Sequence, residues 1–138
     1  MRIPFRFLII CLALLTIFFS SATAGSTETV SAAVSEDGVQ KVEVLAGSYF
    51  FKPDHIVVRV NTPVELSIRK EWGLIPHTFE AHDPGLGLDV KESLSTEPKV
   101  IRFTPHKTGT YEFYCANKFL FFESHREKGM KGVIEVVE

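Results

Sequence analysis

The stretch YEFYCANKFLFFESHREKGMKGV, residues 111–133, decides how the rest of the chain is interpreted. It places Cys115, His125 and Met130 in one short segment between two runs of strand-forming residues. A thiolate, an imidazole and a thioether form a soft, mixed ligand set for a metal ion. The stretch therefore predicts a metal-binding loop between the last two strands, which needs a further imidazole from elsewhere in the chain.

Upstream of this loop, apolar and polar residues alternate with a period of two, which is typical of half-buried β-strands. The alternation is clearest over residues 64–69, and Asn61-Thr62-Pro63 and the segment 83–88 are typical of turns and loops. Strands are predicted at residues 42–44, 50–51, 56–60, 64–69, 78–80, 100–104, 110–114 and 132–137. Seven or eight short strands with no long helical period predict an all-β protein, a Greek-key β-sandwich or barrel. The only helical turn that fits lies within residues 118–124.

The N-terminal segment, residues 1–24, has the features of a signal peptide. Arg2 and Arg6 flank the start of an apolar run over residues 7–19, and Ala22-Thr-Ala24 offers a small-x-small cleavage site. An uncleaved anchor is the alternative, although the run is short for a membrane span. Cys11 follows Ile10 rather than a small residue, so a lipoprotein is not favoured.

The remaining chain is expected to be one exported, periplasmic domain. Residues 25–38 are rich in Ser, Thr and Ala and predict a flexible linker, followed by a domain over residues 39–138. Cleavage would remove two arginines and no acid, so the formal net charge of −2 becomes −4. That balance, without a basic stripe, argues against nucleic-acid binding. We expect a monomer that does not contact the membrane after cleavage.

Cleavage would leave Cys115 as the only cysteine. Paired cysteines are usual in oxidising compartments, and a lone exposed thiol would be oxidised. A buried core thiol is the simple alternative. Metal binding explains the residue better, because a metal-bound, buried thiolate is protected.

The missing imidazole is predicted to be His77, because Pro76 stiffens the backbone immediately before it. Taken singly, a surface histidine or a core methionine would be the ordinary interpretation of His77, His125 or Met130. Their order along the chain together with Cys115 favours a shared metal site. The other histidines are expected to be solvated rather than to form a second copper site; they are His55, His82 and His106.

Several motifs together resemble the signature of cupredoxins, the plastocyanin- and azurin-like copper proteins. The motifs are GTYEFYC at 109–115, His125, GMKGVIEV at 129–136, FKPDHIVVRV at 51–60 and PHTF at 76–79. The resemblance covers roughly residues 40–137. It implies a cupredoxin-like sandwich with one type 1 copper ion held by His77, Cys115, His125 and Met130.

The chain departs from small blue copper proteins in two places. The spacing C-x9-H-x4-M is long, and resembles instead exported copper-tolerance cupredoxins and the type 1 domain of copper nitrite reductases. This resemblance allows a green as well as a blue site. Thr78 stands where azurin and plastocyanin carry Asn, so the usual clamp between the copper loops is expected to be altered.

Three functions compete on this interpretation. The first is a one-electron carrier with a redox partner protein, and the second is copper sequestration or tolerance without a dedicated partner. Met130 would be the only methionine after cleavage, which argues against pure storage of Cu(I) on thioethers. An enzyme is not expected, because Tyr114 and Ala116 flank Cys115 where copper oxidases and reductases carry a bridging His.

Residues 119–122, Phe-Leu-Phe-Phe, follow Cys115 closely. They are expected to pack into the core above the metal site, with a hydrophobic docking surface as the alternative. The charged residues Arg126, Glu127 and Lys128 are expected to be solvated.

Overall fold

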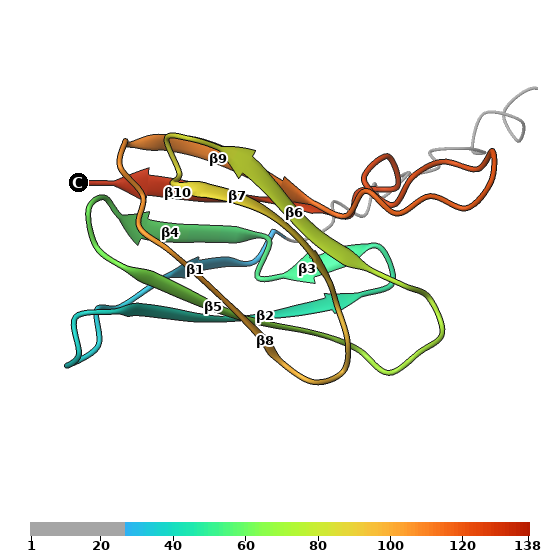
Figure 1. Ribbon diagram of the computed structural model, residues 1–138, viewed down its shortest axis with the longest axis horizontal. Coiled ribbons are helices and arrows are strands. Elements are labelled where there is room, and N and C mark those ends of the chain that lie inside the picture. The colour runs from blue at the N-terminus through green and yellow to red at the C-terminus, as the bar shows by residue number, and fades with distance from the viewer. Residues whose placement is uncertain (1–26) are drawn as a thin grey trace, which may run out of the picture.

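The computed structural model describes residues 27–138, which form ten β-strands in two packed sheets (Figure 1). The strands are β1 (Thr29–Ser31), β2 (Gln40–Gly47), β3 (Phe50–Lys52), β4 (His55–Arg59), β5 (Val64–Lys70), β6 (Thr78–Asp83), β7 (Leu88–Ser93), β8 (Lys99–Phe103), β9 (Gly109–Tyr114) and β10 (Lys131–Val137). The predicted all-β sandwich is confirmed. Within the described residues no helix is long and apolar enough to cross a membrane.

The two sheets differ in size. One has six strands in the order β1-β4-β10-β9-β6-β7, and the other has four in the order β3-β2-β5-β8. β4 pairs in parallel with β1 and β10, and β2 pairs in parallel with β5, whereas the remaining ladders are antiparallel. This topology places β6 beside β9. The predicted metal site lies where β6 begins and β9 ends, because His77 precedes β6 and Cys115 follows β9.

The core lies between the sheets and follows from the alternation in the sequence. In β5, Val64, Leu66 and Ile68 are buried while the residues between them face outward, as the period of two predicts. Below the metal-site end, Phe51, Phe79 and Phe113 form an aromatic cluster whose ring centroids lie 5.2 to 6.1 Å apart. These rings give β3, β6 and β9 a rigid common support.

Two strands were not predicted, and both lie at edges of the larger sheet. β1 falls within residues 25–38, the predicted linker, and pairs in parallel with β4, so ordered structure begins before Val39. Three residues are too few to show a period in the sequence. β7 follows the turn at 84–87 and buries only Leu88 completely, because an edge strand needs few apolar residues.

Three loops leave the sandwich at the same end, on the right in Figure 1. They are the β2–β3 turn, the β5–β6 loop and the long β9–β10 loop. The β9–β10 loop projects well beyond the strands. Residues 118–124, where a helical turn was considered, contain turns and no helix.

Candidate metal centre

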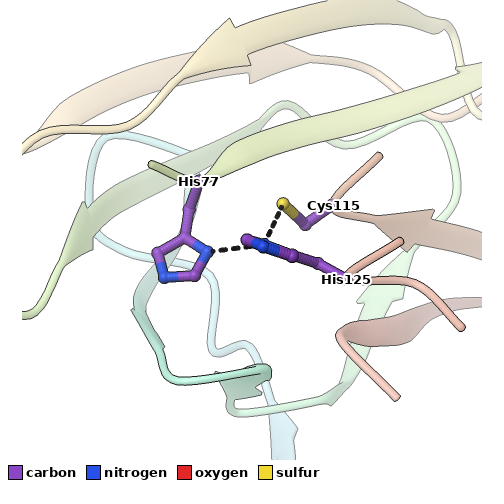
Figure 2. A group of neighbouring side chains, drawn as sticks. All are labelled: His77, Cys115 and His125. Carbon is purple, nitrogen blue, oxygen red and sulfur yellow. Dashed lines mark hydrogen bonds between the residues drawn. The ribbon is translucent and has the colours of Figure 1, made fainter. Parts of the chain in front are cut away.

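The strands deliver the four predicted residues to one end of the sandwich. His77 immediately precedes β6, and Cys115 immediately follows β9. Because β6 and β9 are neighbours, with Glu80 opposite Tyr114, these two side chains meet although they are far apart in the sequence. His125 and Met130 come from the loop that returns to β10 (Figure 2 shows the two histidines and the cysteine).

The ligand atoms of His77, Cys115 and His125 all lie within 4.8 Å of one another, and all three residues are buried. The two histidine Nδ1 atoms are 3.2 Å apart, and Cys115 Sγ lies 3.4 Å from Nδ1 of His125. In Figure 2 the two imidazoles and the thiol converge on one point from two different loops. Within residues 27–138 this is the only such group of His, Cys, Asp or Glu side chains.

Met130 is completely buried and tied to the other two loop residues. Its N–H donates to the carbonyl of His125 at 2.9 Å, and its own carbonyl accepts the N–H of Cys115 at 3.0 Å. The N–H of His125 in turn donates to the carbonyl of Asn117 at 2.8 Å. The backbone of the loop is thus closed on itself, so that it carries Cys115, His125 and Met130 as one unit.

Both imidazoles are neutral at ordinary pH. Burial is the main cause that lowers the pKa of His77 to about 4, and the neighbouring His125 and Lys70 contribute less to the shift. Burial and then Lys128 also lower the pKa of His125. A neutral imidazole has a free nitrogen lone pair, which is the form that binds metals.

This donor set fits a type 1 copper ion. Cys115 is a free, buried cysteine, and its sulfur lies 3.4 Å from Nδ1 of His125. A thiolate with two imidazoles and a nearby thioether is the ligand combination of such sites. His77, Cys115 and His125 would hold the ion, with Met130 next to them.

Two further residues complete the surroundings of the site. The N–H of Thr78 donates to Cys115 Sγ at 3.3 Å, so the residue that replaces the usual Asn still links the two loops. Tyr49 meets the ring of His125 edge-on, with centroids 5.0 Å apart. No sequence pattern indicated a role for Tyr49, because its position depends on a turn in which it has a positive φ of 66°.

Glu80 is a buried carboxylate that the sequence analysis missed. It is 5% exposed and accepts a hydrogen bond from the Thr78 hydroxyl at 3.0 Å. From its residue type alone, a glutamate in a short strand would be expected to be exposed to solvent. Glu80 is buried because β6 pairs with a strand on each side, and the local sequence does not indicate that pairing.

The remaining histidines lie outside this group. His55 contacts Glu135 at 2.8 Å, and His82 contacts Asp89 at 2.5 Å, each at a partly or fully exposed position. His106 is exposed beside the β8–β9 turn. Within residues 27–138 none of them belongs to a group of three potential ligands whose ligand atoms all lie within 4.8 Å of one another.

The prediction that residues 119–122 pack into the core is wrong. Phe119, Leu120, Phe121 and Phe122 are 69%, 70%, 84% and 51% exposed. Their loop extends beyond the strands, so no second layer can cover them, and Phe121 and Phe122 stack on each other at 4.8 Å instead. The docking alternative stays a prediction.

Comparison with known proteins supports this description. A family model for the cupredoxin-like domain matches residues 8–135. The metal-binding domain of the Streptococcus pneumoniae D39 Cu(I)-exporting P-type ATPase CopA, solved with Cu(I), is 29% identical. The match covers 83% of this chain and 100% of that one, with a TM-score of 0.62. A search of curated proteins found no match.

Two other solved structures share the fold at lower identity. A copper binding protein in the apo form is 20% identical, with 81% of this chain and 100% of that one covered and a TM-score of 0.60. Reduced auracyanin from Roseiflexus castenholzii is 16% identical, with 78% and 99% covered and a TM-score of 0.58. Together with the buried His77, Cys115 and His125 and the adjacent Met130, the family match leads to one conclusion: this chain is a member of the cupredoxin-like domain family.

Proposed function

We propose that this protein is an exported one-electron carrier with a single type 1 copper ion at His77, Cys115, His125 and Met130. The convergence of three buried ligand atoms within 4.8 Å carries the proposal. When bound, copper would supply the one-electron Cu(II)/Cu(I) couple. The thiolate, imidazole and thioether donors suit both oxidation states.

The surroundings of the ligands favour electron transfer because they resist rearrangement. His77 and Cys115 stand at the ends of paired strands above the aromatic cluster, and hydrogen bonds close the loop that carries His125 and Met130. A site that keeps one geometry in both oxidation states loses and gains an electron with little reorganisation. Flexible ligands would instead favour simple metal capture and release.

An apolar surface next to the site supports docking of a partner protein. A hollow of about 580 Å³ is lined by residues that include His77, His125, Tyr49, Leu74 and Phe119. Leu74 is almost completely exposed, and Phe119, the first residue of the exposed run 119–122, lines the same hollow. We call Leu74, Ile75 and residues 119–122 the apolar rim. Exposed apolar patches of this kind mark interaction sites.

Voltammetry of the copper-loaded protein tests the proposal directly. We expect a reversible one-electron wave, one copper per chain, and an intense visible absorption from the thiolate. An irreversible wave, or loss of copper on reduction, would remove the electron-carrier role and leave copper binding.

Copper handling is the second candidate. The specific observation that favours it is the 29% identity to a metal-binding domain of a Cu(I) exporter, which covers that whole domain. On this proposal the site would hold Cu(I) outside the cytoplasm and lower its toxicity. A deletion strain separates the two roles: copper-sensitive growth supports handling, whereas normal copper tolerance removes it.

Export and monomeric state belong to the same proposal. They are supported by the positively charged start and apolar run of residues 1–24 and by the mild negative charge that would remain. N-terminal sequencing of the protein from a periplasmic extract should begin at Gly25. We expect no catalysis by the isolated domain, and turnover of nitrite or phenols by pure protein would contradict this.

A further inference from the structure

The buried pair of Thr78 and Glu80 lies directly behind the cysteine sulfur. Both residues belong to β6 and are two positions apart, so their side chains share one face of the strand. The Thr78 hydroxyl lies 3.0 Å from Glu80 Oε1 and 3.6 Å from Cys115 Sγ. The hydroxyl can therefore be directed either to the carboxylate or to the sulfur.

The other partners of Glu80 determine which direction is taken. Lys91, opposite Glu80 on β7, places Nζ 3.2 Å from the same Oε1 atom. An ammonium group has donors and no acceptor, and a carboxylate oxygen paired with it acts as an acceptor only. In this ion pair Oε1 can accept a hydrogen bond from Thr78 but cannot donate to it. The single proton of the Thr78 hydroxyl thus points to Glu80.

The sulfur consequently receives less hydrogen bonding than its neighbours could provide. Among the described residues, Thr78 alone offers donors to Sγ besides His125, and only its backbone N–H, at 3.3 Å, is free to donate. With its one proton on the shorter 3.0 Å contact to Glu80, the hydroxyl does not use its 3.6 Å contact with the sulfur for a hydrogen bond. Hydrogen bonds to a copper-bound thiolate reduce its electron donation and help to set the reduction potential.

We propose that Glu80 is a positioning residue that withholds the Thr78 hydroxyl proton from Cys115 and so keeps the sulfur a strong donor. The inference rests on the copper site of the proposed function, although not on its role as an electron carrier. Burial of a carboxylate is costly unless it is paired. Lys91 and Thr78 provide the pairing here, and His82 Nε2 lies 3.9 Å from the other oxygen.

The test is a double-mutant cycle on the copper-loaded protein with Thr78→Val, Glu80→Leu and the double variant. The measured quantities are the energy of the thiolate-to-copper absorption band and the reduction potential. Thr78→Val should leave the band unchanged, because the lost hydroxyl did not donate to sulfur. Glu80→Leu should release the hydroxyl towards sulfur, shift the band to shorter wavelength and raise the potential.

The double variant separates hydrogen bonding from charge. Without the hydroxyl, Glu80→Leu should no longer shift the band, and any remaining rise in potential reports the lost negative charge. Glu92→Leu is the matched control, since Glu92 on β7 is also paired with a lysine, Lys99, at 2.9 Å. It should leave the band in place.

Two results would overturn the inference. A band shift in Thr78→Val alone means that the hydroxyl already donates to sulfur. Equal shifts in Glu80→Leu and the double variant mean that Glu80 acts through charge alone. If Glu80→Leu does not fold, the nearly isosteric Thr78→Val still decides the direction of the hydroxyl. Absence of a thiolate band in the unsubstituted protein would instead refute the proposed function.

Discussion

The backbone amide of Thr78 donates to the sulfur of Cys115 at 3.3 Å, which joins the start of β6 to the end of β9 at the ligand itself. His77, the preceding residue, faces His125 with the two Nδ1 atoms 3.2 Å apart. The residue that links the loops is therefore adjacent to one ligand and bonded to another. A substitution in either loop should therefore change the positions of the candidate ligands in both loops.

Cys115→Ser should abolish the intense visible absorption of the copper protein, because a hydroxyl cannot supply the sulfur-to-copper transition. The absorption spectrum after addition of one equivalent of Cu(II) measures this. His106→Gln is the control, since His106 is exposed and outside the site, and it should keep full colour. Colour that persists in Cys115→Ser would show that the ligand assignment is wrong.

Met130→Gln should retain one copper ion but lower the reduction potential, because an amide oxygen favours Cu(II) more than a thioether does. Met130→Leu should raise the potential, since it removes the thioether donor without replacing it. Voltammetry and metal analysis of both variants give the two quantities. If the potential is the same in both variants and in the parent protein, Met130 does not contribute a ligand to the copper site.

The sequence predicted the sandwich and the site for different physical reasons. Alternation in β4 and β5 is strong because their inward faces are continuous core, as Ile56, Val58 and Leu66 show by their burial. The convergence of the candidate ligands was predictable because Cys115, His125 and Met130 lie in one loop. Only His77 comes from a distant part of the sequence.

The features that the sequence did not predict depend on neighbouring strands. Glu80 is buried because β7 and β9 flank it, and no local pattern records that. The exposure of Phe121 depends on how far its loop projects from the sandwich. Apolar composition alone favoured burial, since most phenylalanines are buried, and only the position of the loop reverses that expectation.

The copper-free protein should lose stability as the pH falls from about 6.5 towards 4. In the folded state the pKa of His77 is lowered to about 4 from its ordinary value of 6.5. Between these values the unfolded chain binds more protons than the folded one, so stability is fully present above 6.5 and is lost as the pH falls. The loss should be on the order of 1–3 kcal/mol. The lowered pKa of His125 acts in the same direction.

Urea unfolding of the copper-free protein at several pH values measures this loss. His77→Gln removes the titrating group and should flatten the dependence over the same interval. A variant that keeps the full slope would assign the pH dependence to other groups.

Phe113→Ala should destabilise the fold by about 3–5 kcal/mol, because it removes a fully buried ring from the aromatic cluster with Phe51 and Phe79. Phe113→Leu should cost less, since it leaves a smaller cavity. Urea unfolding gives both values.

Val100→Ala is the control: Val100 is 44% exposed on β8, and truncation of its side chain should change stability by only about 0.5 kcal/mol. Comparable losses in Phe113→Ala and Val100→Ala would contradict the central place of this cluster.

Phe121→Ser should leave stability within about 0.5 kcal/mol of the parent protein, because the side chain is 84% exposed. It should nevertheless slow electron exchange between two copies of the protein, if the apolar rim is where molecules meet next to His125. We expect a roughly tenfold decrease, equivalent to about 1.4 kcal/mol of docking free energy. Line broadening in NMR spectra of mixed reduced and oxidised protein measures the exchange rate. Val34→Ser is the control, because Val34 is 48% exposed but lies outside the rim, and it should exchange at the parent rate. Equal rates for Phe121→Ser and Val34→Ser would place electron entry away from this rim.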